Sequence, residues 1–151
     1  MLTRRFTGIW LWTLLGLIVL PTIPTSTLYA DTALEDLELV SVAQDLFRQQ
    51  SRDVPRGAME VRYIEGWGRV FYIKMVSRRT SVSEDMLSAF LVGGALSQHA
   101  RKSLDHVVVI GVMEFKDTEE MVLSSTGECC EKLYNNRITT EQFSDNCLVA
   151  E

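Results

Sequence analysis

The sequence predicts an α+β domain built on a mostly antiparallel sheet of about four strands. Two pairs of apolar, β-rich segments indicate the strands: residues 59–65 with 69–76, and residues 106–115 with 121–125. A helical pattern over residues 82–101 separates the pairs, which gives a hairpin–helix–hairpin order. Short turns within each pair favour an α+β fold over a parallel doubly wound one. An N-terminal helix and a C-terminal pair of short helices complete the expected domain.

The first thirty residues are typical of a secretory signal peptide. Arg4 and Arg5 precede the apolar run of residues 9–20, and Ala30 supplies a small residue at the expected cleavage point. An uncleaved membrane anchor is the alternative, because residues 6–30 carry no charge. Both interpretations place the rest of the chain outside the cytoplasm, in the periplasm or secreted.

Residues 31–151 are expected to form a single globular domain, since this length suffices for one core. Without the two leader arginines, thirteen basic and twenty acidic side chains remain, which is a formal charge of −7. An acidic domain with no basic cluster argues against nucleic acids and anionic lipid head groups as partners.

The first helix is expected over residues 33–50. Thr32 and Glu35 have the spacing of a capping box, and an apolar face with helical period follows them. The first hairpin then turns at Trp67, which lies between Gly66 and Gly68. Trp67 is interpreted as a hydrophobic cap on its own hairpin, or alternatively as an exposed aromatic anchor for a partner.

The helix over residues 82–101 starts at a second predicted capping box, Ser81 with Glu84. Gly93 and Gly94 lie in its middle, where each glycine costs about 1 kcal/mol relative to alanine. We interpret them as a flat surface that lets the helix approach the sheet closely. A kink or a helix–helix dimer contact is the alternative.

The strand over residues 106–115 is nearly continuous apolar sequence, so it should be central and covered on both faces. Helices are expected on one face. The other face should be covered by the first helix or by a second copy of the protein.

The C-terminal segment is predicted to form two short helices. Ser125 with Glu128 indicates a capping box for a helix over residues 127–135. Thr139 with Gln142 indicates another for a helix after Thr139, and Ile138 and Phe143 have the spacing of a hydrophobic staple.

A bend between these helices would bring Cys147 near the adjacent Cys129 and Cys130. A disulfide is therefore expected, with Cys130–Cys147 slightly favoured over Cys129–Cys147. Three alternatives are a redox site, a zinc site completed by His99 and His106, and a disulfide between two chains.

No motif for catalysis or for a cofactor occurs in the sequence. It lacks a nucleophile elbow, a phosphate-binding glycine loop and a metalloprotease histidine pair. Ser103, Asp105 and His106 are too close in sequence to form a catalytic triad. We expect no cofactor and no metal.

Two functional hypotheses follow. The first is a small non-catalytic binding or assembly module outside the cytoplasm, which contacts another envelope or secreted protein, or itself as a homodimer, through the sheet or Trp67. The second is a small secreted thiol-active or hydrolytic enzyme, which would need a pocket containing His99, His106 or a free Cys129.

Overall fold

The computed structural model describes residues 35–114 and 118–151. The expected leader, Thr32 with its capping box, and the turn at residues 115–117 lie outside these ranges. The order of elements is α1, the short 3-10 helix η2 (Arg56–Ala58), β1, β2, α2, β3, β4, α3, α4 and β5. The fold is α+β, as the sequence predicts.

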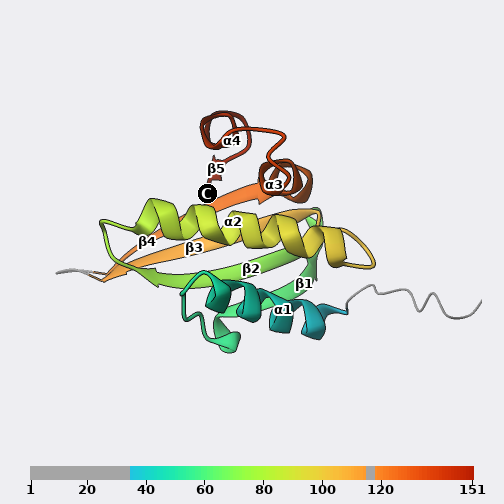
Figure 1. Cartoon of the computed structure of the whole chain (residues 1–151), viewed down its shortest axis with the longest axis horizontal. Helices are drawn as coiled ribbons and strands as arrows, with labels where there is room; N and C mark the ends of the chain where they lie inside the picture. Colours follow the sequence, from blue (N-terminus) through green and yellow to red (C-terminus); the bar gives the residue numbers. More distant parts are fainter. Residues whose placement is uncertain (1–34, 115–117) are drawn as a thin grey trace, which may run out of the picture. The chain divides into compact units, whose positions relative to one another are not determined.

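The sheet has five strands in the order of the sequence (Figure 1). Its three antiparallel pairs are β1–β2, β3–β4 and β4–β5, while β2 and β3 run parallel on either side of the α2 crossover. The fifth strand was not predicted, because two residues are too short for an alternating pattern. The strands are β1 (Met59–Ile64), β2 (Gly68–Ser77), β3 (His106–Glu114), β4 (Thr118–Thr126) and β5 (Val149–Ala150).

Helix α1 (Asp36–Gln49) begins after Glu35, whose backbone N–H donates to the carboxylate of Glu38 at 3.2 Å. This bond satisfies one end of a capping box that uses Glu35 as its first residue. The helix buries an apolar face that includes Leu39 and Phe47 against β1 and α2. The amphipathic helix α1 therefore contributes its apolar face to the core, as its sequence pattern predicts.

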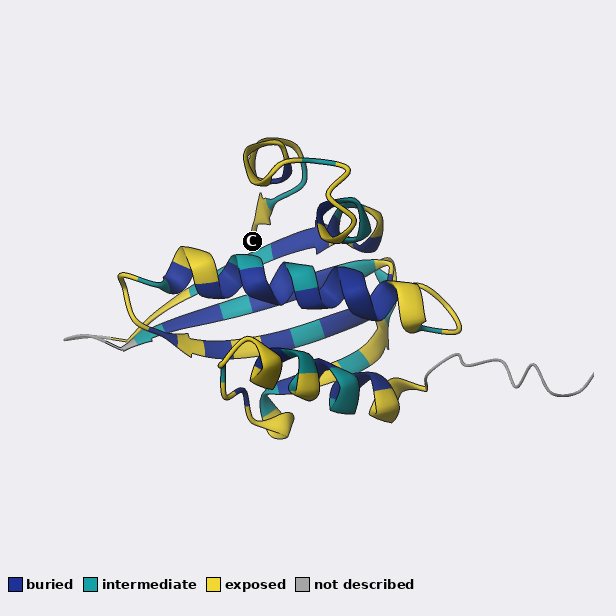
Figure 2. Ribbon diagram, viewed as in Figure 1, coloured by how far each residue is buried: buried dark blue, intermediate teal, exposed yellow. Residues whose placement is uncertain are grey.

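Helix α2 (Val82–His99) lies on the same face of the sheet as α1 and is buried along most of its length (Figure 2). The helix begins at residue 82 as predicted, but its cap differs from the prediction. Ser81 is the N-cap residue, but its hydroxyl donates to the carboxylate of Asp85 at 3.0 Å and does not cap the helix backbone. The Ser81–Glu84 capping box is therefore wrong.

The glycine pair of α2 makes two close contacts. A Cβ on Gly93 would lie 2.7 Å from a methyl carbon of Val107 on β3, and a Cβ on Gly94 would overlap the carbonyl oxygen of Cys130. The expected close approach to the sheet is thus confirmed for Gly93. Gly94 serves a second purpose, which is contact with helix α3 of the same chain.

The opposite face of the sheet is not covered by α1, contrary to one of the two expectations. Val108 and Val112 of β3 point to this face, yet they are only 3% and 5% exposed. Long side chains shield it: Lys74 on β2 reaches Glu120 on β4 at 2.7 Å, which spans β3. Aliphatic stems can cover apolar surface while their charged ends stay in water, so Val108 and Val112 are buried although no helix of the described residues covers this face.

Helices α3 (Gly127–Tyr134) and α4 (Thr140–Asn146) form the expected C-terminal pair beside α2. Thr139 and Gln142 make the predicted capping box. The Ser125–Glu128 box is wrong, because Thr126 caps α3 by accepting from the backbone N–H of Cys129 at 3.3 Å.

Replacement of Gly94 by alanine should lower the free energy of unfolding by about 1–3 kcal/mol, the usual effect of overpacking. The new methyl group would overlap the backbone carbonyl of Cys130, which cannot move away as a flexible side chain could. Gly57→Ala is the control, because nothing lies within 4 Å of its Cβ position. Urea denaturation followed by circular dichroism measures both, and equal losses of stability would contradict the close contact of α2 with α3.

Candidate functional site

Trp67 lies in the turn between β1 and β2. Its backbone N–H donates to Ile64 at 3.1 Å, and Gly66 and Gly68 on either side have φ angles of 81° and 78°. The indole ring lies 4.9 Å from the ring of His106, whose Nδ1 donates to the Trp67 carbonyl at 2.8 Å. Trp67 is consequently half-buried, and its role in contacting a partner stays a prediction.

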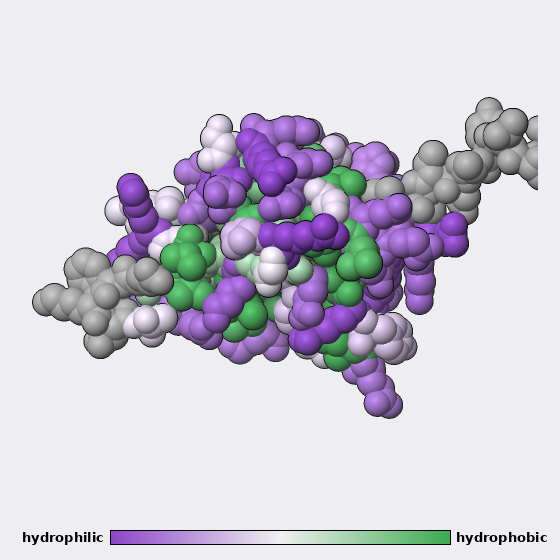
Figure 3. All heavy atoms as spheres, turned by 90° about the horizontal axis from the view of Figure 1, so that it is seen from below, coloured by the Kyte–Doolittle hydropathy of each residue, from purple (hydrophilic) through white to green (hydrophobic). Residues whose placement is uncertain are grey.

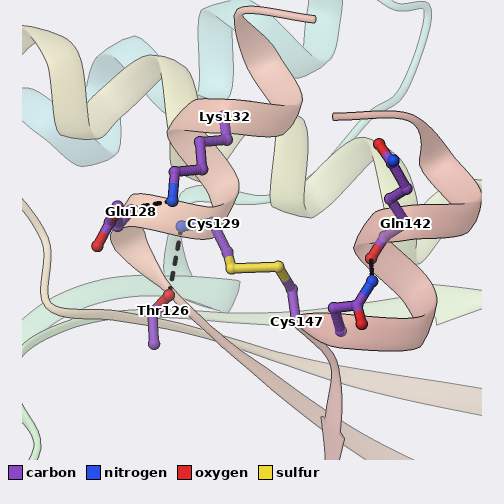
Figure 4. Close-up of a disulfide and its surroundings, with 7 residues drawn as sticks. Thr126, Glu128, Cys129, Lys132, Gln142 and Cys147 are labelled. Atoms are coloured by element: carbon purple, nitrogen blue, oxygen red, sulfur yellow. Dashed lines mark hydrogen bonds and ion pairs between the residues drawn. A yellow bond between two sulfur atoms is a disulfide. The ribbon is translucent and has the colours of Figure 1, made fainter. Parts of the chain in front are cut away.

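The disulfide joins Cys129 to Cys147 and connects the start of α3 to the end of α4 (Figure 4). The slightly favoured Cys130–Cys147 pairing is therefore wrong. Successive side chains on a helix point about 100° apart, and Cys130 shares the buried face of α3 with Leu133. Only Cys129 is left to face α4.

The Cys129–Cys147 bond stabilises the two short helices and indicates the compartment in which the protein is found. Closing a loop with a sequence separation of 18 contributes on the order of 3 kcal/mol in the chain-entropy estimate, which matters for two helices too short to be stable alone. Disulfides persist in oxidising compartments, so Cys129–Cys147 indicates an extracytoplasmic environment.

Cys130 is the free cysteine and is fully buried between α3 and α2. Burial raises the pKa of its thiol to about 12, although the Ser125 hydroxyl acts in the opposite direction. A thiol in this state is a poor nucleophile and cannot reach a second chain. The alternatives of a redox site and an interchain disulfide are therefore not supported.

The other candidate catalytic residues are not brought together. Asp105 binds backbone, since its carboxylate accepts from the N–H of Arg69 at 2.7 Å. His99 lies at the exposed end of α2, while His106 is held by Trp67. In residues 35–114 and 118–151, no three His, Cys, Asp or Glu side chains form a group that could hold a metal ion.

An apolar cleft lies between α2, the middle of β4 and α4. It encloses about 370 Å³, and neither histidine nor any cysteine lines it. Its floor includes the buried rings of Phe90 and Phe143, whose centroids are 5.3 Å apart. The remaining lining residues are Ser83, Glu84, Met86, Leu87, Met121, Leu123, Thr140, Ser144 and Leu148.

The cleft has a polar rim with one charged side chain. Ser83, Thr140 and Ser144 are exposed, and Glu84 is the only ionisable residue in the lining. Leu87, Met121 and Leu148 are half-buried, so apolar surface remains open to solvent. No signal in the sequence distinguishes these residues from core residues, and none shows that α4 leaves a cleft beside α2.

A second, larger hollow of about 950 Å³ runs along the outer edge of β2, and we call it the edge groove. The segment between α1 and β1 forms its far wall, with Val54 and Pro55. Arg52 of this wall forms ion pairs with Glu84 and Asp85 at the start of α2, which fix the wall in place. From the side of α1 and η2, mostly hydrophilic side chains surround separate hydrophobic patches (Figure 3).

Comparisons with known proteins identify no relative: no family model, no curated protein and no solved structure matches this chain. Within the two described ranges, none of the helices combines the length and apolar character needed to cross a membrane.

The native protein should leave Cys130 unmodified by iodoacetamide at pH 8, because its thiol is buried and protonated. One carbamidomethyl group per chain is expected only after denaturation without reductant, and three after denaturation with reductant. Intact-protein mass spectrometry counts these groups. Rapid modification of the native protein would revive the thiol-active interpretation.

The stability of the protein should fall above pH 9 because of Cys130. Its pKa in the folded state, about 12, exceeds the ordinary thiol value of 9.0, so the unfolded chain loses this proton first as pH rises. The stabilising contribution is complete below pH 9 and is lost between pH 9 and about 12; the loss at pH 10 is about 1.4 kcal/mol. Cys130→Ala lacks this contribution. Denaturation curves at pH 8 and pH 10 should therefore show a larger decrease for the wild type than for the variant.

Proposed function

We propose that residues 31–151 form a small extracytoplasmic, non-catalytic binding module of the cell envelope or secretome. The apolar cleft between α2, β4 and α4 carries this proposal. It is concave, apolar and bordered by a few polar side chains, which is the usual character of a binding site for small molecules or side chains. The basic and apolar start of the sequence, which we interpret as a signal peptide, supports export.

The disulfide supports the cleft because it anchors the wall that α4 provides. Cys147 directly follows α4 and precedes Leu148, which lines the cleft. A preformed wall lowers the entropy lost on binding. We therefore assign the bond a role in keeping the cleft open as well as in stability.

The chemistry of the lining indicates what binds. An apolar group fits between Leu87, Met121 and Leu148, while Glu84 at the rim disfavours anionic ligands. The bound group would be a neutral or cationic apolar moiety, for example an apolar side chain of another exported protein. A hydrolytic or thiol-active function lacks support, because the cleft contains no histidine or cysteine.

The neutral apolar fluorophore N-phenyl-1-naphthylamine is a suitable probe for this cleft. Its fluorescence should increase when it binds the wild type. Ser144→Trp places an indole in the cleft and should weaken binding at least about tenfold, whereas the control Asp145→Trp should change binding less than about twofold. Ser144 and Asp145 are neighbouring exposed residues of α4, but only Ser144 lines the cleft.

Methyl NMR spectra locate the probe independently. Shifts are expected for the methyl groups of Leu87, Met121 and Leu148. Thermal melting confirms that both tryptophan variants remain folded. Equal probe binding by the two variants, or methyl shifts elsewhere only, would refute the cleft as the binding site.

A further inference from the structure

We propose that the outer edge of β2, at residues Lys74–Ser77, accepts an extended peptide of another protein as an additional strand. This site is separate from the apolar cleft and does not depend on the function proposed for it. The edge groove occupies the place that this strand would take.

The edge is open because β1 is shorter than β2. Met59, the first residue of β1, pairs with Ile73, and the chain before it turns away through Pro55 and η2. Residues Lys74–Ser77 continue to pair with β3 on the inner side. On the outer side, no hydrogen bond from any described residue reaches their backbone.

The direction of the free backbone groups follows from Arg69. Its backbone carbonyl accepts from the N–H of Asp105 at 2.8 Å, and its own N–H donates to the Asp105 carboxylate, so both groups point toward β3. Successive residues of a strand direct their backbone groups to alternate sides. Lys74 and Val76 therefore direct an N–H and a C=O each into the groove. An extended polypeptide is the ligand whose backbone matches this repeat.

The side chains around the groove indicate the peptide sequence. A strand that continues the antiparallel direction of β1 places one residue opposite Val76, the next opposite Met75 and the third opposite Lys74. Val76 is 66% exposed and favours a β-branched neighbour, while Lys74 favours an acidic one. Between them, the residue opposite Met75 faces buried Val54 and Met59, so it should be apolar.

Charge argues against a second copy as the occupant. Antiparallel strands pair residues that both direct their backbone groups toward the partner, so self-pairing centred on Val76 would place Lys74 of each copy opposite Arg78 of the other. Like charges close together across a strand pair are destabilising. A peptide with an acidic residue avoids this repulsion.

An acetylated and amidated Ser-Thr-Val-Val-Glu peptide is the probe. The first valine is designed to lie opposite Val76 and the glutamate opposite Lys74. Isothermal titration calorimetry should detect binding, and the backbone amides of Lys74 and Val76 should gain protection from hydrogen exchange. N-methylation of the first valine should weaken binding at least about tenfold, because its N–H points to β2. N-methylation of the second valine, whose N–H points away, should change binding less than about threefold.

Variants of the protein at Val76 test the same backbone hydrogen bond between the peptide and β2. Val76→Pro removes the N–H that faces the groove and should weaken binding at least about tenfold, whereas Val76→Thr keeps the N–H and should bind like the wild type. Circular dichroism confirms that both remain folded. The proposal fails if no binding occurs at about 1 mM peptide, if both methylated peptides bind alike, or if Val76→Pro binds normally. A wild-type dimer that Val76→Pro dissociates would assign the edge to a second copy and would equally overturn it.

Discussion

The close approach of α2 to its neighbours is the constraint on which the rest of the structure depends. Gly93 lets the helix pack closely against Val107 of β3, and Gly94, about 100° further around the helix, lets the backbone of Cys130 approach it. The height of α2 above the sheet and the position of α3 are fixed by these two contacts. Through the disulfide, α3 then positions α4 and with it one wall of the apolar cleft.

Among the described residues, side chains and not helices cover the second face of the sheet. Lys74 and Glu120 meet across β3, and the guanidinium of Arg62 lies 4.2 Å from the ring centre of Tyr72. Such exposed pairs contribute little stability by their charges alone. Their main effect is to keep water from the valines of β3 while leaving the surface hydrophilic.

Most elements of the fold could be predicted because their residues carry a clear period. The apolar face of α1, the alternation in β1 and the continuous apolar run of β3 each match one structure. The predicted start of α3 at Gly127 is confirmed, but its capping residue could not be predicted as reliably, because Ser125 and Thr126 are both good capping residues. The adjacent Cys129 and Cys130 point about 100° apart, so the pairing depends on which face of α3 is buried, and the capping pattern does not show this.

The apolar cleft and the edge groove correspond to no periodic pattern in the sequence. The cleft exists because α4 covers only part of the adjoining surface of α2 and β4, and the edge groove exists because β1 begins opposite Ile73 rather than Ser77. Both depend on where elements end in space, and the local sequence does not encode this. Trp67, His99 and His106 were considered as candidate site residues because of their residue types alone. In the structure, Trp67 and His106 contact each other through their rings and one hydrogen bond.

The adjacency of Cys129 and Cys130 has a consequence for how the protein matures. In an unfolded chain both thiols are almost equally near Cys147, so random oxidation would produce the two pairings in similar amounts. Only packing of α3 against α2 distinguishes them, since it withdraws Cys130 into the core. Selective formation of the native pairing therefore requires that the helix dock before the bond forms. Oxidation before docking would leave about half of the chains with a Cys130–Cys147 bond, which must be reduced or isomerised before the native packing can be reached.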